Sequence, residues 1–223
     1  MDAASRIESV INRLKSHHVD EKFFPGISAL ENKADVLPAE TIARRLLVLL
    51  AASFTAYNFD GVEKVTDWLK RENVWASASE KEKLFFRDPA PPETEKQQLS
   101  WRFEAAYILA WALQKVSGRP DASRELPETG VKEFLLSIPA IGTPVEEFLR
   151  KAKLRSLDEI IDEKLFYESA VRSLNDQQEN DLENSTSIHP MATFERYFAL
   201  CFITNGNTIS WDELTRIEEE DEF

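Results

Sequence analysis

The sequence predicts an all-α fold: a single irregular bundle of about eight to ten helices around a central buried helix at about residues 95–116. Three observations support this fold class. Apolar residues recur with a helical period along almost the whole chain. Five segments carry the S/T/D-x-x-E pattern of a helix-starting capping box. The run at 105–113 is apolar on every face, and a helix of that kind is buried on all sides.

Length and composition favour one globular domain spanning residues 1–223. The chain is 43% apolar and 30% charged, an ordinary composition that excludes wholesale disorder, collagen-like repeats and linkers. The longest apolar runs, 46–54 and 105–113, are about half of a membrane span. The first residues show no basic-then-apolar signal segment. The single cysteine, Cys201, excludes an internal disulfide and a multi-cysteine metal site, so we expect a cytoplasmic protein without a metal or cofactor.

The first part of the chain, residues 1–37, is expected to form a helix at about Ala3–Ser16 and a mixed segment, packed on the rest. Ile7, Val10 and Leu14 fall on one face of that helix. Pro38 stands where a helix can begin, because a first-turn residue does not need its N–H. The next helix is therefore predicted at about 39–57.

The capping boxes locate the later helix starts. In such a box two side chains satisfy backbone donors that the first helical turn leaves without partners. The five boxes are Asp60/Glu63, Ser79/Glu82, Thr143/Glu146, Ser156/Glu159 and Ser210/Glu213.

Several segments should separate the helices. Prolines within 88–92 interrupt the chain, and Gly118 and Pro120 end the central helix. A short helix is predicted at 131–138 and long ones from 157 to about 175 and at 191–203. The polar segment 175–190 is predicted to be a mobile loop, and Asn205-Gly206 a turn.

The net charge of −13 is unevenly distributed. Up to Trp111 there are 15 Lys and Arg against 17 Asp and Glu, and from Ala112 onward 12 against 23. The chain ends in an acidic tail, residues 218–223. Acidity of this kind repels phosphate backbones and anionic membrane surfaces and attracts basic surfaces. We therefore expect no nucleic acid or membrane partner, and a basic protein as a possible partner.

The first candidate site is Trp101-Arg102-Phe103-Glu104, which brings two opposite charges into an apolar helix. We expect the Glu104 carboxylate to be buried, which is costly unless it is paired or made neutral by a raised pKa. Residues two apart on a helix do not face each other, so Arg102 and Glu104 each need a partner from elsewhere. The candidate partners of Glu104 are Arg44, Arg45 and Arg196.

The second candidate is Glu195-Arg196, where a charged pair again leads into an apolar helix. Arg196 meeting Glu104 would satisfy both groups. Trp211 and Asp212, near the C-terminal end, complete the candidate polar cluster. Two interpretations stay open: a buried salt bridge that fixes helix register, or a carboxylate with a raised pKa that acts as an acid or base.

Three blocks of the sequence resemble the uncharacterised bacterial family called domain of unknown function 4272. The resemblance runs from about Pro38 to Leu214. It implies a helical, soluble bacterial protein and no established activity. Two local departures are Phe202, where the family usually has tryptophan, and the acidic ending after Arg216-Ile217. The first block comprises Arg44/Arg45, Val65, Trp68-Leu69, Trp75 and Ser79-x-x-Glu82; the second Trp101-Arg102-x-Glu104-Ala105, Leu109 and Trp111-Ala112-Leu113; the third Glu195-Arg196-Tyr197-x-Ala199-Leu200, Asn205-Gly206 and Trp211-Asp212-Glu213.

Two functional hypotheses follow from the sequence. The first is a non-enzymatic helical protein that acts by binding a macromolecule, with a basic protein as the possible partner. The alternative is an enzyme or small-ligand binder with a carboxylate and arginine pocket around Glu104 and Arg102. The sequence contains no phosphate-binding loop and no recognisable catalytic motif.

Overall fold

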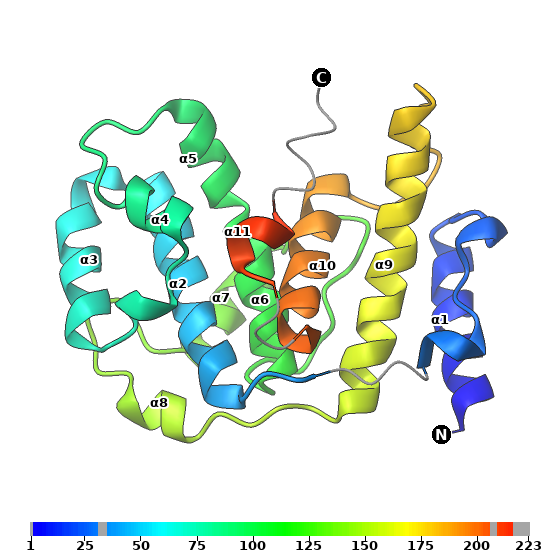
Figure 1. Cartoon of the computed structure of the whole chain (residues 1–223), viewed down its shortest axis with the longest axis horizontal. Helices are drawn as coiled ribbons and strands as arrows, with labels where there is room; N and C mark the ends of the chain where they lie inside the picture. The colour runs from blue at the N-terminus through cyan, green and yellow to red at the C-terminus, as the bar shows by residue number, and fades with distance from the viewer. Residues whose placement is uncertain (1, 31–34, 206–208, 216–223) are drawn as a thin grey trace.

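The computed structural model describes residues 2–30, 35–205 and 209–215, and within them the chain is all-helical, as predicted (Figure 1). This part of the chain forms eleven α-helices and no β-sheet, with one isolated bridge between Asp35 and Asn205. The helices are α1 (Ala3–Ser16), α2 (Ala39–Tyr57), α3 (Val62–Arg71), α4 (Glu80–Phe85), α5 (Glu93–Ser100), α6 (Arg102–Ala112), α7 (Glu128–Ser137), α8 (Glu146–Arg150), α9 (Leu157–Glu179), α10 (Pro190–Thr204) and α11 (Trp211–Leu214).

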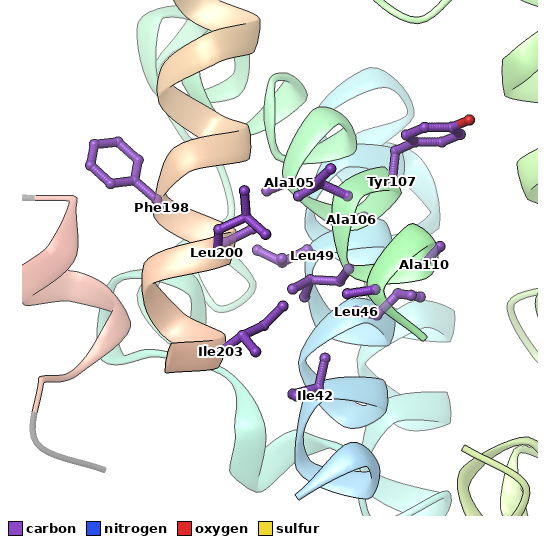
Figure 2. Close-up of a cluster of buried hydrophobic side chains, with 14 of the residues drawn as sticks. Ile42, Leu46, Leu49, Ala105, Ala106, Tyr107, Ala110, Phe198, Leu200 and Ile203 are labelled. Carbon is purple, nitrogen blue, oxygen red and sulfur yellow. The ribbon is translucent and has the colours of Figure 1, made fainter. Parts of the chain in front are cut away.

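Helix α6 is the centre of the molecule, between α2 and α10 (Figure 1). It contributes small side chains to the contact, among them Ala105, Ala106 and Ala110, all fully buried. Larger side chains from the neighbouring helices, such as Leu46 of α2 and Leu200 of α10, surround them (Figure 2). Small residues facing large ones let helix axes approach closely while the space between them stays filled.

The predicted central helix of 95–116 is two helices, α5 and α6, because the chain breaks at Trp101. The Ser53 hydroxyl of α2 donates a 2.9 Å hydrogen bond to the Ser100 carbonyl. The Glu104 N–H, the usual donor to that carbonyl, instead donates to the carbonyl of Trp101. This competition gives a physical reason for the break and lets α5 and α6 run in different directions.

Three of the five predicted capping boxes are confirmed, at Ser79/Glu82, Ser156/Glu159 and Ser210/Glu213. The other two predictions are wrong. Asp60 lies in a short 3₁₀ turn, and α3 begins after Gly61 without a side-chain cap. The Thr143 hydroxyl donates back to Ala140.

The N-terminal end of α8 is instead capped by a side chain that is distant in sequence. The Glu72 carboxylate, which follows α3, accepts the Val145 N–H at 3.1 Å. A carboxylate from another element can satisfy a helix N-terminus as well as a local one does. The Thr143/Glu146 pattern could not predict this, since it describes only residues close in sequence.

Segment 175–190 differs from the predicted mobile loop. Helix α9 continues to Glu179, and the following loop is tied to other parts of the fold by hydrogen bonds. The Ser187 N–H donates to the His17 carbonyl and the His189 N–H to the Ala122 carbonyl, while Ile188 is buried. The predicted turn at Asn205-Gly206 lies partly outside the described residues, and the acidic tail 218–223 lies wholly outside them.

The N-terminal helix α1 packs along α9 (Figure 1). Its buried face carries Ile7, Val10 and Leu14. Arg6 bonds to Asp158 and Asp162 of α9 at 2.6 and 2.7 Å. Apolar burial thus holds α1 in place, and the ion pairs at the edge fix its register.

Among the described residues, no helix combines the length and the apolar character that crossing a membrane requires.

Enlarging a central alanine should destabilise the fold. We expect Ala106→Leu to lower the free energy of unfolding by about 1–3 kcal/mol, because the site has no room for added carbons. Urea unfolding followed by circular dichroism measures the change. The matched control is Ala4→Leu on the exposed face of α1, which should change it by less than about 0.5 kcal/mol. Equal stability of Ala106→Leu and the parent chain would contradict the close packing of α6.

Candidate functional site

The structure confirms the predicted contact between Arg196 and Glu104. The guanidinium of Arg196, on α10, donates from Nη2 and Nε to Glu104 Oε2, on α6, at 2.7 and 3.0 Å. The second carboxylate oxygen, Oε1, accepts the N–H of Leu126 at 2.7 Å. The pair therefore joins two central helices to the loop between α6 and α7.

Arg196 has a partner for every N–H that it carries. Besides Glu104, it donates to the carbonyls of Asp121 and Arg124 at 2.8 and 3.0 Å, and to the Tyr167 hydroxyl at 3.4 Å. Its side chain is fully buried. A buried ion pair is favourable only when its remaining hydrogen-bonding groups are satisfied, and this one meets that condition.

Arg102 pairs with Glu195, so both predicted candidates take part in ion pairs from α6 to α10, although Arg102 is only partly buried. Arg102 Nη1 lies 2.5 Å from Glu195 Oε1. Burial raises the pKa of Glu195, while the charge and hydrogen bond of Arg102 oppose that rise. Within the described residues, Arg102 Nε and Glu195 Oε2 have no hydrogen-bond partner. This pair is consequently less completely satisfied than the one at Arg196.

A third ion pair, Arg45 with Glu82, is buried and was not predicted. The two side chains form a double hydrogen bond of 2.6 and 2.7 Å, each only 2% exposed. Glu82 Oε2 also accepts the Ser79 N–H, so one carboxylate serves both the capping box of α4 and the ion pair. Arg45 and Arg44 were both predicted as candidate partners of Glu104, and both predictions are wrong: Arg45 bonds to Glu82, and Arg44 bonds to Glu40 and the Asn73 carbonyl.

Trp211, on the short helix α11, lies between two of these pairs. The guanidinium carbon of Arg45 is 4.1 Å from its ring centroid, and that of Arg102 is 5.6 Å away. Phe202 meets the same ring edge-on at 5.7 Å. A delocalised guanidinium stacks well on an aromatic face, so Trp211 shields both charges from water.

Asp212, the neighbour of Trp211, lies outside this stack. Its Oδ2 accepts the N–H of Lys81 at 3.1 Å and so ties α11 to the first turn of α4. The structure thus places Trp211 among the ion pairs and gives Asp212 an anchoring contact.

A further buried carboxylate that the sequence analysis missed is Glu163 of α9, which is fully buried. It accepts two hydrogen bonds from Arg13 of α1, at 2.8 and 3.0 Å, and lies 3.1 Å from Arg119. The arginines come from segments far from α9 in sequence, so no local spacing could reveal the cluster.

A cleft of about 520 Å³ opens where α5 meets α6. Tyr57 at the end of α2 lies on its rim with 78% of its surface exposed, and Trp101 and Phe103 contribute two more aromatic rings. Glu125 is the exposed acidic residue of the cleft, and Glu104 also lines it although only 4% of its surface is exposed. The complete lining is Tyr57, Gln97, Ser100, Trp101, Phe103, Glu104, Glu125, Leu126 and Val131.

The predicted pocket of a carboxylate and an arginine is only half present, because one of the two residues lines the cleft. Glu104 lines it, whereas Arg102 is not among the lining residues and is paired with Glu195. Both oxygens of Glu104 are already engaged, by Arg196 and by the Leu126 N–H. The arrangement favours Glu104 as part of the scaffold of the cleft over Glu104 as an acid or base.

Trp101, Phe103 and Glu104 belong to the first candidate site that the sequence indicates, whereas Tyr57 and Glu125 were not predicted as lining residues. An exposed aromatic residue at a helix end, such as Tyr57, is the one local signal that could have indicated them. Among the described residues, no three His, Cys, Asp or Glu side chains gather in a way that could hold a metal ion.

Removing the charge of Glu104 should cost much of the stability. We expect Glu104→Gln to lower the free energy of unfolding at pH 7 by about 3 kcal/mol or more, because Arg196 keeps its charge in a dry site. Chemical denaturation measures this cost. The control is Glu147→Gln, at the exposed pair with Lys151, which should leave the free energy of unfolding almost unchanged because water screens that pair. An unchanged Glu104→Gln would show that the pair does not support the fold.

Exchanging the two charges should not restore stability. In the double variant Glu104→Arg with Arg196→Glu, the new glutamate would face the carbonyls of Asp121 and Arg124, and the new arginine would face the Leu126 N–H. The backbone groups keep their places, so the carboxylate acceptor of the new glutamate would face carbonyl acceptors, and the guanidinium donor of the new arginine would face an N–H donor. Recovery of the parent stability in the double variant would show that these backbone contacts contribute little.

The buried tyrosines should resist ionisation. Burial raises the pKa of Tyr167 to about 12 and also raises that of Tyr107 and Tyr197. Since the folded chain retains protons that the unfolded chain releases near pH 10, this contribution to stability is present below pH 10 and is lost as pH rises toward about 12. Ultraviolet titration should show fewer than the four tyrosines ionised in the folded chain at pH 11, and all four in urea. Four tyrosinates in the folded chain at pH 11 would contradict their burial.

Comparison with known proteins identifies a family for this chain, and that family has no assigned activity. No curated protein matches the chain, and no solved structure matches it either. One family model matches residues 6–214, which is most of the chain and includes the four buried carboxylates, their arginine partners and the cleft. The chain belongs to the family described as "Domain of unknown function (DUF4272)".

Proposed function

We propose that this protein is a non-catalytic, cytoplasmic binding protein whose partner is another protein with a basic segment. The observation that carries the proposal is how the acidic residues are divided between the interior and the surface. The four buried carboxylates of the described residues each meet an arginine. These four are Glu82, Glu104, Glu163 and Glu195.

The acidic surplus therefore stays on the surface. Pairing four buried carboxylates with arginines consumes positive charge inside the fold, whereas the net charge of the chain is −13. An unneutralised acidic surface attracts a basic partner and speeds its encounter, and it repels nucleic acid.

One observation supports the alternative of a small-ligand binder: the cleft of about 520 Å³ is within the usual size range of ligand pockets, about 300–1000 Å³. The hydrogen bonds of Glu104 weigh against its use in catalysis, since both oxygens already have partners. The cleft is therefore better explained as a binding site than as a catalytic site.

The test is binding of a labelled peptide rich in arginine and lysine to the full chain, followed by fluorescence anisotropy. We expect binding at low ionic strength that weakens steeply as salt approaches about 0.15 M and above, because screening acts on exposed charges. The control peptide has the same length, with citrulline in place of arginine and glutamine in place of lysine. No binding of the basic peptide at low salt, or equal binding of the control peptide, would overturn the proposal.

A further inference from the structure

We infer that the cleft at the junction of α5 and α6 is the place where an arginine or lysine side chain of the basic partner docks. This inference rests on the proposed function and gives it a location. Three features of the cleft carry it: the charge of its lining, the aromatic rings, and the exposure of the groups that a ligand would meet.

The charge of the lining favours a cation. The charged side chains that line the cleft, Glu104 and Glu125, are both acidic. The Glu104 charge is balanced by Arg196, but Glu125 lies on the rim with 63% of its side chain exposed. The near neighbour of Glu125 is His189, whose Nε2 is 3.7 Å from Glu125 Oε1. A ligand cation would find an accessible carboxylate there.

The cations close to the cleft in sequence have other contacts. Lys96 bonds to Glu93 at 2.8 Å and lies over the Phe59 ring. Arg124, beside Glu125, bonds to Asp121 at 3.0 Å. Neither lines the cleft, and Lys132, the neighbour of Val131, does not line it either. A ligand cation therefore meets no lysine or arginine side chain among the lining residues.

The aromatic rings supply a second attraction. Tyr57, Trp101 and Phe103 line the same cleft, and Tyr57 is 78% exposed. A guanidinium or ammonium group over an aromatic face gains about 0.5–1 kcal/mol at exposed sites and more when water is excluded. The Trp101 ring packs against His189, whose ring centroid is 5.4 Å from its own.

Helix geometry gives the cleft a defined shape. Gly130 of α7 brings its backbone close to Leu126, since an added Cβ would lie 2.8 Å from the Leu126 Cδ1 atom. Leu126 is also the residue whose N–H is held by Glu104. The wall formed by Glu125 and Leu126 is consequently fixed to the central ion pair, and a preorganised wall lowers the entropy cost of binding.

The experiment combines peptide binding with site variants of the full chain. For the basic peptide at low salt, we expect Tyr57→Ala and Glu125→Gln each to raise the Kd about threefold or more, and the double variant about tenfold. The matched control for charge is Glu63→Gln on the exposed face of α3, which should change the Kd less than twofold. Circular dichroism checks that each variant is folded, and both substituted sites are exposed.

A second readout locates the contact. N-acetyl-arginine amide, titrated into the chain, should shift the indole N–H resonance of Trp101 in NMR spectra; loss of that resonance in Trp101→Phe assigns it. The same titration with N-acetyl-citrulline amide should leave the resonance unshifted, because citrulline carries no charge.

The outcomes separate the location from the function. If the basic peptide binds but Tyr57→Ala and Glu125→Gln bind it as tightly as the parent does, the cleft inference is overturned while the proposed function stands. Loss of binding only when the five acids of residues 218–222 are replaced by Gln and Asn would lead to the same conclusion. If no basic peptide binds, the proposed function fails. If spermidine shifts Trp101 and the peptide does not, the cleft takes a small organic cation and the protein-docking inference is overturned.

Discussion

The structure depends on the ion pair between Glu104 and Arg196 at its centre. These side chains bring opposite charges into the interface of α6 and α10, among fully buried apolar residues such as Ala105, Leu109 and Leu200. Charges in such a place are tolerated only when geometry and hydrogen bonds compensate for the water that they lose. The compensation comes from backbone groups of residues 121–126, so the pair fixes a loop as well as two helices.

The other ion pairs also join helices through arginine and glutamate, but their polar atoms are less completely hydrogen-bonded. Arg45 and Glu82 join α2 to α4, and Arg102 and Glu195 join α6 to α10. Trp211 covers both guanidinium groups from the short helix α11. Arg45 Nε, Arg102 Nε and Trp211 Nε1 have no hydrogen-bond partner among the described residues. Since unpaired buried donors destabilise a fold, this side of the cluster is held less firmly than the side at Arg196.

The consequences for function come from the positions of these pairs. By fixing the loop of residues 121–126, the central pair shapes one wall of the aromatic cleft and leaves Glu125 exposed on its rim. The interior charges are paired within the fold, and the accessible acidic group, Glu125, lines the same cleft as Tyr57 and Trp101. A binding role at the surface is consistent with both features, because recognition of a cation needs an accessible carboxylate and an aromatic face.

The sequence by itself determined the all-helical class, the bounds of α1 and α2 and three capping boxes, and it reduced the partner of Glu104 to three candidate arginines, of which the tertiary structure selected Arg196. These depend on local periodicity and on the small number of arginines that can satisfy a buried carboxylate. Tertiary structure decided the rest. The break at Trp101 depends on a hydroxyl from α2, and the cap of α8 on a carboxylate that follows α3. The pairs at Glu82 and Glu163, and the cleft rim at Tyr57 and Glu125, likewise join residues distant in sequence, because each depends on which helix faces which, a relation that no local spacing specifies.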